Sequence, residues 1–505
     1  TVRYHYDFNG NRTATVLPDG RQINYLYYGS GHLHQISLDD EVITDIERDK
    51  LHREIFRTQG KLASRYELDP LGRLKKQIAT LNDLTEGGKG KTKVASGYGQ
   101  TAVKRSYGYD RTGNLTHSTD QRTGTTQFEY DKLGRITQAG SELFAFDPAH
   151  NILSDDLNTV PDNRLKTYNG TTYYYDNFGN LIHRELANGE VQNYFYDLHD
   201  QLVKAEIFKK DGTKETWSYA YDALGRRIGK GRLKNEEVSD DLENQTRFVW
   251  DGSHLLQEIH PDGRYTYIYT DPDSYEPLAQ VRDWTTEDGE SRQQTHYFHG
   301  DQIGIPREMT DKDGNLLWFG NYTGWGRLKE ETKVTDSAYQ PFRLQNQYAD
   351  RETGLHYNFF RYYEPDAGRF VNQDPIGLEG GFNVYQFAPN VQDWVDPLGL
   401  ANRKTFNLGK GYTGALDIFD SGKKSSFEIH VYDPKGKEVG IYGPDEWFNK
   451  HGKKGKPEGI PDSVENSCRG IAVDTGRRIG AVPPKGTANI KGNKLKKFMQ
   501  LLMPD

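Results

Sequence analysis

The sequence predicts a mainly β protein, in which a long run of β-hairpins is followed by a small α/β or α+β domain. Aromatic residues and glycines are abundant, with 33 tyrosines, 22 phenylalanines and 53 glycines in 505 residues, whereas only three residues are methionine. This balance favours many short strands joined by tight turns. A short aromatic–aspartate motif also recurs along the first half of the chain, and it is absent after Leu400, where the composition changes.

The recurring unit reads aromatic-x-aromatic-Asp-x-x-Gly-Asn/Arg-aliphatic, as in YGYDRTGNL around Asp110 and FEYDKLGRI around Asp131. Aromatic residues two apart share one face of a strand, Asp starts a turn by bonding its own backbone, and Gly takes the left-handed position. Each unit therefore predicts a β-hairpin, and because one hairpin cannot bury its aromatic face alone, the hairpins should stack or coil side by side. We interpret the following aspartates as turn residues and not as catalytic ones: Asp7, Asp69, Asp110, Asp131, Asp147, Asp176, Asp197, Asp222 and Asp251.

Two segments interrupt the repeat. Residues 86–100 are rich in Gly and Lys, and residues 234–245 are polar and acidic. Neither segment shows the alternation of a strand or the period of a helix, so both are predicted to be solvated loops.

The repeat resembles the tyrosine–aspartate (YD) repeat of the Rhs/YD family, which includes bacterial Rhs effectors, the C component of insecticidal Tc complexes, and teneurins. The resemblance implies a spiralling cocoon of β-hairpins, the Rhs shell, over residues 1–295, which encloses a C-terminal cargo. Residues 296–400 resemble the Rhs-associated core that closes this shell, and residues 401–505 take the place of the toxin domain. The core matches the family pattern at Gln347, Tyr348, Asp350, Thr353, Gly354, Leu355, Tyr357, Arg361, Tyr362 and Tyr363.

Two copies of Asp-Pro-x-Gly-Leu begin at Asp374 and Asp396, on either side of a turn-rich stretch that can fold the second copy back beside the first. Two adjacent carboxyl groups cannot both ionise, so one keeps a proton while the other acts as a base, as in aspartic proteases. Asp-Pro-x-Gly is also a good turn, and the spacing alone favours that purely structural interpretation.

The resemblance favours catalysis instead. In the family these two positions carry an autoproteolytic activity that cuts just after the second motif, which implies cleavage of the Leu400–Ala401 bond here. Arg369 is a weaker candidate, able to orient a carboxylate or to stabilise an oxyanion, and packing against an aromatic residue of the shell explains it equally well. Val391 replaces the second Pro of the family's Ala-Pro-Asn-Pro, a departure that touches neither aspartate.

The segment 401–505 is basic, with 19 Lys and Arg against 12 Asp and Glu, whereas residues 1–400 hold 46 against 61. A basic domain suits a nucleic acid or another polyanion. Residues 426–443 alternate on both sides of Asp-Pro-Lys-Gly and predict a hairpin, and residues 463–473 and 492–502 predict helices. The single cysteine, Cys468, excludes an intrachain disulfide scaffold and a Cys-rich zinc site.

The candidate catalytic residues of the tail are His430, on the predicted hairpin, and His451. Metal-free RNA cleavage needs one His as base on the 2′-hydroxyl, another as acid on the leaving oxygen, and cations for the phosphate, here Lys450, Lys453 and Lys454. Taken singly, each His is more often structural. The main hypothesis is that the tail is a nuclease, and an RNase is favoured. No cofactor or metal is predicted.

Two alternatives remain open: an NAD-consuming ADP-ribosyltransferase or glycohydrolase toxin, and a structural shell of the Tc C-component or teneurin kind with a binding tail. The resemblance also implies a secreted protein, delivered from the bacterial cytoplasm into a target cell, by type VI secretion in the case of Rhs effectors. The expected partners are the chain's own toxin inside the shell, a cognate immunity protein and, through a region before Thr1, a secretion-spike protein and a chaperone. The repeat is already under way at Thr1, which suggests a fragment of a longer protein, and no run approaches the ~18 apolar residues of a membrane helix.

Overall fold

The structure is a computed structural model of the 505-residue chain. It describes residues 1–29, 31–81, 101–154, 159–234, 242–335, 338–380, 383–400, 403–409, 412–420, 425–433, 438–443, 446–448 and 455–478. The chain divides into two compact units, Thr1–Asn402 and Arg403–Asp505, and each is described by itself.

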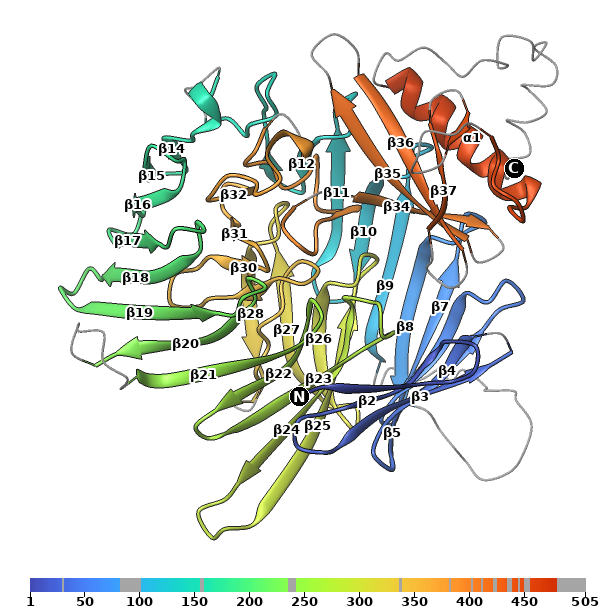
Figure 1. The fold of residues 1–505 in the computed structure, drawn as a ribbon, viewed down its shortest axis with the longest axis horizontal. Helices are drawn as coiled ribbons and strands as arrows, with labels where there is room; N and C mark the ends of the chain where they lie inside the picture. Colours follow the sequence, from blue (N-terminus) through green and yellow to red (C-terminus); the bar gives the residue numbers. More distant parts are fainter. Residues whose placement is uncertain are drawn as a thin grey trace. The chain divides into compact units, whose positions relative to one another are not determined.

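The first unit is built from antiparallel strands that pair with their neighbours in sequence order (Figure 1). Among the described residues, 13 strands form one sheet and 15 form a second, and four short strands form a third. The mainly β fold and the side-by-side stacking of hairpins are therefore confirmed.

The first sheet contains β1 (Arg3–Tyr6), β2 (Arg12–Val16), β3 (Gln22–Tyr28), β4 (His32–Leu38), β5 (Glu41–Arg48), β6 (Glu54–Gln59), β7 (Leu62–Leu68), β8 (Leu74–Leu81), β9 (Thr101–Tyr109), β10 (Leu115–Asp120), β11 (Gly124–Tyr130), β12 (Ile136–Ala139) and β13 (Glu142–Leu143). The second sheet contains β14 (Thr167–Tyr168), β15 (Thr171–Tyr175), β16 (Leu181–Glu185), β17 (Val191–Tyr196), β18 (Leu202–Phe208), β19 (Lys214–Tyr221), β20 (Arg227–Leu233), β21 (Leu242–Asp251), β22 (His254–His260), β23 (Gly263–Tyr269), β24 (Pro277–Thr285), β25 (Ser291–Gly300), β26 (Pro306–Asp311), β27 (Leu316–Tyr322) and β28 (Leu328–Lys333). The third contains β29 (Tyr348–Ala349), β30 (His356–Asn358), β31 (Arg361–Glu364) and β32 (Arg369–Phe370); the short strand β33 is Trp394–Val395, and 3-10 turns lie at Pro161–Asn163 and Gly377–Gly380.

The repeat aspartates begin the turns of these hairpins, as the sequence predicts. At Asp110, Oδ1 accepts the backbone N–H groups of Thr112 (2.8 Å) and Asn114 (2.9 Å), and the Gly113 N–H bonds the Asp110 carbonyl at 3.1 Å. Gly113 has a φ of +85°, which Gly adopts without strain. The second carboxylate oxygen, Oδ2, is bonded by the side chain of Asn114 at 2.9 Å, so one turn satisfies both oxygens. We call this arrangement the YD turn.

Sequence reasoning missed three further turns of this kind, because no aromatic pair precedes them. They begin at Asp49, Asp301 and Asp311, whose Oδ1 atoms each accept the N–H groups of the residues two and four positions further on. Asp251, by contrast, belongs to the repeat, but its carboxylate has partners from distant strands. Its carboxylate is bonded by Tyr4 (2.8 Å) and Arg12 (2.6 Å), from strands that precede it by more than 200 residues in the sequence.

At several repeats the tyrosine of the motif links its hairpin to the hairpin before it. Tyr130 Oη donates to the carbonyl of Leu115 at 2.9 Å, and Leu115 is the fifth residue after Asp110. At three other repeats the tyrosine likewise bonds the carbonyl of the fifth residue after the preceding repeat aspartate: Tyr109 bonds Leu74, Tyr196 bonds Leu181, and Tyr221 bonds Leu202. This hydrogen bond explains why the residue before Asp is often a tyrosine and seldom a phenylalanine, which has no hydroxyl.

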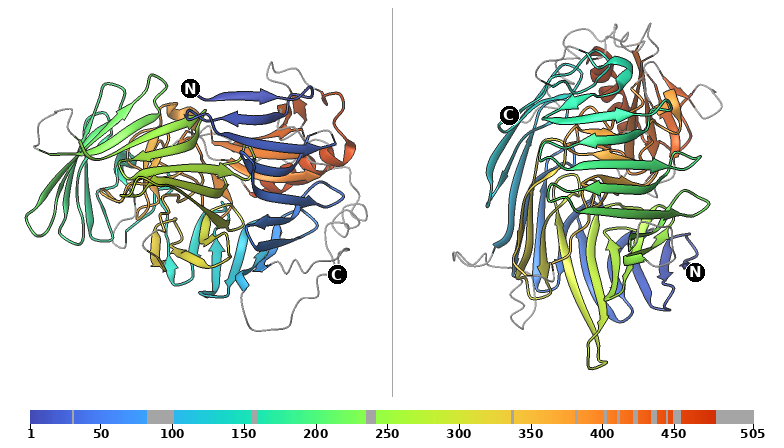
Figure 2. Two further views of the ribbon diagram at one scale, coloured as in Figure 1. Left: turned by 90° about the horizontal axis from the view of Figure 1, so that it is seen from below. Right: turned by 90° about the vertical axis from the view of Figure 1, so that its left-hand side faces the viewer.

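The two large sheets pack together through apolar side chains of β3–β5 and β22–β24. Ile23, Ile36 and Ile46 of the first sheet share one buried cluster with Leu278 and Val281 of the second. Figure 2 shows these blue and yellow-green strands close together in both of its views. Burial of each of these side chains contributes roughly 1.5–3 kcal/mol, so this contact is a main source of the unit's stability.

The segment 338–400 joins turns of both sheets. Asn390 Nδ2 donates to the Gly134 carbonyl of the first sheet at 2.9 Å, and Tyr385 Oη donates to the Gly179 carbonyl of the second at 2.8 Å. Arg227 of β20 pairs with the fully buried Asp350 at 2.5 Å. This segment therefore has its place fixed from several sides, which makes it a rigid support for a site.

The second unit is an α+β domain, as predicted, with α1 (Asp462–Arg478) and the strands β34 (Arg403–Gly409), β35 (Tyr412–Asp420), β36 (Ser425–Tyr432), β37 (Glu438–Tyr442) and β38 (Trp447–Phe448) paired in order. Val464, Cys468 and Ala472 of α1 pack against Phe427 and Ile429 of β36 in one buried cluster. Burial raises the pKa of the Cys468 thiol to about 12, so this cysteine is a small core residue.

The predicted hairpin of residues 426–443 is confirmed by the pairing of β36 with β37, and the predicted helix of 463–473 is confirmed as part of α1. The loop predicted for 234–245 is wrong in its last residues, because Leu242–Gln245 extend β21 and continue its ladder with β20. The loop at 86–100 and the helix at 492–502 lie outside the described residues. Within the described ranges, none of the helices has the length and apolar character needed to cross a membrane.

Candidate active site

Both Asp-Pro-x-Gly-Leu motifs fold as turns that share part of the YD-turn arrangement. The Gly377 N–H bonds the Asp374 carbonyl at 2.9 Å, and the Gly399 N–H bonds that of Asp396 at 3.4 Å. Both glycines have a left-handed φ, +60° and +67°. Oδ1 of Asp374 accepts the N–H of Ile376 at 3.1 Å, and Oδ1 of Asp396 accepts the N–H of Leu400 at 3.0 Å. Both motifs are therefore turns, as the structural interpretation predicts.

The fourth residue after the aspartate sets these two turns apart. In most YD turns it is Asn or Arg, whose side chain bonds Oδ2 of the same aspartate, as Arg73 does for Asp69 at 2.6 Å. In the two motifs it is leucine, Leu378 and Leu400. Because leucine has no donor, Oδ2 of Asp374 and of Asp396 can pair with a residue from elsewhere in the fold.

That residue is Arg361, the first residue of β31. Its Nη2 lies 3.0 Å from Oδ2 of Asp374 and 3.6 Å from Oδ2 of Asp396. The exposed fraction of the three side chains is only 1%, 4% and 1%, so this is a buried carboxylate–guanidinium–carboxylate cluster. The guanidinium lies over the ring of Phe370, 3.6 Å from its centroid, in a cation–π contact.

Burial is the main cause of the altered acidity in this cluster. It raises the pKa of Asp374 to about 6, and the nearby Asp396 raises it further, while Arg361 acts against the shift. Burial also lowers the pKa of Arg361 to about 10, so the guanidinium keeps its charge at neutral pH. The cluster thus contains one carboxyl group that holds its proton near pH 6 beside a second carboxyl group and a cation, which is the arrangement that acid–base chemistry requires.

Arg369, predicted as a possible helper, does not contact either aspartate. Its guanidinium bonds Asn151 Oδ1 at 3.3 Å and the carbonyl of Asn163, and it lies 4.8 Å from the centroid of the Tyr385 ring. Packing against an aromatic residue is therefore the correct interpretation of this side chain. Sequence reasoning noticed Arg361 as part of a family pattern but not as the partner of the aspartates.

In the tail, the structure describes only His430 among the predicted site residues. It is half-buried on β36, and its Nδ1 lies 3.3 Å from Oε2 of Glu438 on the neighbouring strand β37. Glu428 lies on its other side, at 3.8 Å from Nε2. Lys450, His451, Lys453 and Lys454 lie outside the described residues.

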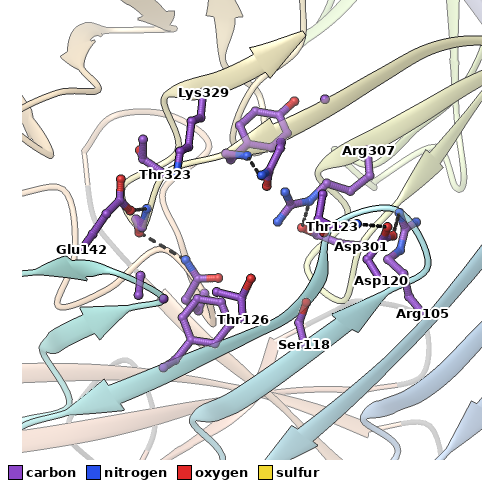
Figure 3. Close-up of a pocket in the computed structure, with 18 of the residues that line it drawn as sticks. Arg105, Ser118, Asp120, Thr123, Thr126, Glu142, Asp301, Arg307, Thr323 and Lys329 are labelled. Carbon is purple, nitrogen blue, oxygen red and sulfur yellow. Dashed lines mark hydrogen bonds and ion pairs between the residues drawn. The ribbon is translucent and has the colours of Figure 1, made fainter. Parts of the chain in front are cut away.

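A separate polar cavity of about 110 Å³ lies in the first unit, between β9–β11 and β26–β28 (Figure 3). Within it, Arg307 pairs with Asp301 at 2.9 Å, and Glu142 accepts the Gly324 N–H at 2.7 Å. The residues around the cavity do not include either aspartate of the cluster, so the two features are distinct.

Comparison with known proteins assigns the chain to a family. The family described as RHS Repeat matches residues 109–143, a stretch that contains two YD turns, and the family described as RHS protein matches residues 295–332. The chain belongs to the Rhs family.

Among curated proteins, this Rhs chain is 38% identical over 465 residues to the double-stranded DNA deaminase toxin A of Burkholderia cenocepacia, covering 88% of the chain and 32% of that protein. It is 30% identical over 412 residues to the probable deoxyribonuclease RhsB of Dickeya dadantii, covering 77% of the chain and 26% of that protein. The Rhs chain thus spans about a third or less of the length of these relatives.

The solved structure of the Photorhabdus luminescens Tc holotoxin pore matches 79% of the Rhs chain and 21% of its own chain, at 18% identity and a TM-score of 0.54. This likeness concerns the fold. It supports the description of the first unit as part of a β-strand cocoon, as the repeat predicts.

Proposed function

We propose that the chain is part of an Rhs-type antibacterial effector, which cuts itself after Leu400 and so frees the basic tail from its shell. The observation that carries the proposal is the buried Asp374–Arg361–Asp396 cluster, together with the bond from the Leu400 amide to Asp396. Through that bond, Leu400, whose carbonyl belongs to the Leu400–Ala401 peptide bond, contacts a carboxyl group of the cluster. A pair of buried carboxyl groups next to a backbone strand suits peptide hydrolysis.

In the proposed reaction, Asp396 removes a proton from a water molecule, whose oxygen forms a bond to the Leu400 carbonyl carbon. Asp374, the carboxyl group with the raised pKa, donates its proton toward the leaving nitrogen as the C–N bond breaks. Arg361 forms ion pairs with both carboxyl groups, and its positive charge stabilises the negative charge that develops on the carbonyl oxygen. The products are a carboxyl group on Leu400 and a free amine on Ala401.

The substitutions Asp374→Asn and Asp396→Asn test this proposal. Each should leave a single uncut polypeptide on a denaturing gel, whereas the parent separates into a shell and a tail of about 100 residues. The matched control is Asp69→Asn, because Asp69-Pro70-Leu71-Gly72 repeats the sequence of the second motif but forms an ordinary YD turn. Complete cutting in either motif variant would contradict the assignment.

For the tail, we propose a toxin that acts on nucleic acid, with RNA cleavage foremost. The basic charge of the segment and the His430–Glu438 pair support this, since a carboxylate beside a histidine fixes its tautomer and strengthens it as a base. The two relatives described above have names that refer to DNA, a deaminase and a deoxyribonuclease, so DNA is the alternative substrate. His451 is the proposed acid, and Lys450, Lys453 and Lys454 the proposed phosphate ligands.

Expression of the full chain in bacteria tests the tail. Growth should stop and RNA should be degraded, and His430→Ala should relieve both effects, while His199→Ala, a change at an exposed His of a YD turn, should not. Degraded or base-modified DNA with intact RNA would replace RNA by DNA as the substrate. Undiminished killing by His430→Ala would remove this residue from the site.

We further propose, from the family alone, that the shell encloses the tail and that the effector is secreted by type VI secretion with a spike protein and a chaperone. A cognate immunity protein should protect the producing cell. Protease treatment of the cut protein tests enclosure, because an enclosed tail should survive while the same tail released by denaturation should be digested.

A further inference from the structure

We propose that Asn346 and Asn358 are positioning residues of the self-cleavage reaction, which hold the shell side of the cut in register so that the bond after Leu400 is the one attacked. This inference rests on the proposed function. The segment concerned is Asp396–Leu400, named here the strap.

Four successive backbone carbonyls of the strap each accept a hydrogen bond from a different donor. Asn358 Nδ2 donates to the Asp396 carbonyl at 2.8 Å, and Asn346 Nδ2 donates to the Pro397 carbonyl at 2.6 Å. The Phe360 N–H then donates to the Leu398 carbonyl at 3.2 Å, and Arg361 Nε donates to the Gly399 carbonyl. Hence the strap is fixed at every residue up to the one that carries the scissile bond.

Three of these donors come from the tip of one hairpin. Asn358 ends β30 and Arg361 begins β31, and the two residues are direct partners across the hairpin, with Phe360 between them. The hairpin therefore connects the arginine that binds the two aspartates to the asparagine that binds the strap. A shift of the strap by one residue would remove these bonds and also displace Leu400 from Asp396.

The strap also fits this hairpin by shape. A Cβ on Gly399 would lie 2.7 Å from the Asn358 carbonyl oxygen, closer than side chains approach backbone, and Gly399 has a φ of +67°. No other residue of the strap is glycine, so only one register brings glycine against the hairpin. Asn346 has a φ of +59°, a conformation that Asn tolerates, and this directs a short amide side chain at the strap.

The donors differ in their surroundings, which makes separate tests possible. Asn358 is fully buried, whereas Asn346 is half-buried at a turn. Loss of the Asn346 side chain therefore disturbs the core less. Asn346→Gly is the gentler variant because Gly keeps the positive φ without strain.

Refolding tests the proposal. The full chain is recovered uncut from inclusion bodies, diluted into buffer, and followed for the rate of cutting and for the mass of the released tail. Asn346→Gly and Asn358→Ala should slow cutting by about 10- to 100-fold, because a misplacement of about 1 Å can cost that much. They should also yield tails of more than one mass, since a looser strap presents neighbouring bonds. A residue with a merely structural role would not change the position of the cut.

Asn114→Ala is the matched control, because Asn114 is a buried asparagine that bonds Asp110 and Thr112 within an ordinary YD turn, and its loss should lower stability without changing the cut. The unfolding temperature of every variant is measured in the Asp396→Asn background. Should Asn358→Ala fail to fold, Asn346→Gly decides alone. Parent-like rate and a single tail mass in Asn346→Gly would overturn the inference while the Asp374 and Asp396 assignment stands. Full cutting by Asp396→Asn would overturn both.

Discussion

Asp69 and Asp396 begin turns with the same four residues, Asp-Pro-Leu-Gly, and only the fifth residue differs, Arg73 in one and Leu400 in the other. At Asp69 the arginine bonds Oδ2 from within the turn, and 13% of the aspartate side chain is exposed. At Asp396 the exposed fraction is 1%, and the partner is Arg361, from another hairpin. The comparison shows how a structural turn becomes a candidate catalytic one: its carboxylate loses the local partner and is buried beside a second carboxylate.

Asp301 shows that loss of the local partner is not sufficient. Its turn also has an aliphatic fifth residue, Ile305, yet Arg307 bonds its Oδ2 at 2.9 Å from only six residues away. Asp374 and Asp396 differ because their shared cation is supplied by a hairpin that both turns contact. The site therefore depends on tertiary packing of the segment 338–400 rather than on the motif alone.

The largest effect should follow from giving Asp374 the local partner that Asp69 has. Leu378→Arg converts the first motif into Asp-Pro-Ile-Gly-Arg, and the leucine is 70% exposed, so the larger side chain fits without repacking. A guanidinium bonded to Asp374 should lower its pKa by 1–3 units and so reduce the protonated fraction, and the rate of cutting, roughly 10- to 1000-fold at pH 7. The rate is measured by refolding the uncut chain.

The control is Leu378→Gln, which adds a polar side chain of similar length without charge and should leave the rate within about twofold, since it does not pair strongly with a carboxylate. Arg73→Leu gives Asp69 the five residues of the second motif and should produce no new fragment. Equal rates in Leu378→Arg and the parent would show that the local partner is not what separates the two kinds of turn.

A smaller effect, about tenfold for each pH unit, should appear in the pH dependence of cutting. The pKa of Asp374 is raised to about 6, chiefly by burial, and the proposed mechanism needs this group protonated. The rate should therefore fall as the pH rises above about 6. The raised pKa has a second consequence: the native state binds more protons than the unfolded state between about pH 4 and 6, so the contribution of Asp374 to stability declines as the pH rises through this range.

Refolding in buffers from pH 5 to pH 8.5 measures the rate, and the same series with the control Asn114→Ala shows whether folding itself depends on pH. A rate that stays constant or rises between pH 6 and pH 8 would exclude Asp374 as the proton donor. The Asp69 turn offers the contrast, because Asp69→Asn should leave the pH profile of the parent unchanged.

The sequence predicted the hairpins well, because the YD turn is local: Asp, Gly and the fifth residue lie within one stretch, and their bonds follow from residue type. The same locality explains the correct helix and hairpin of the tail. It also explains why Arg361 was overlooked as the partner of the aspartates, whereas Arg369 bonds Asn151 and lies beside Tyr385. Arg369 is nearer to Asp374 in sequence, but Arg361 belongs to the β30–β31 hairpin, which Arg227 of β20 holds by bonds to the hydroxyl groups of Tyr357 and Tyr362.

The smallest expected effect is a loss of stability, without a loss of cutting, when a bond between two structural turns is removed. Tyr130→Phe removes the hydroxyl that links its hairpin to the Leu115 carbonyl and keeps the ring, so the free energy of unfolding should fall by about 0.5–1.5 kcal/mol. Cutting should proceed at the parent rate, because this hydroxyl bonds the first sheet and not the segment 338–400. Urea denaturation in the Asp396→Asn background measures the stability, and refolding of the variant with Asp396 intact measures the rate. Tyr196→Phe repeats the test in the second sheet, where the hydroxyl bonds Leu181. A large loss of cutting in either variant would mean that the tyrosine bonds between hairpins affect the cluster from a distance. The structural and the catalytic turns would then not be independent of each other.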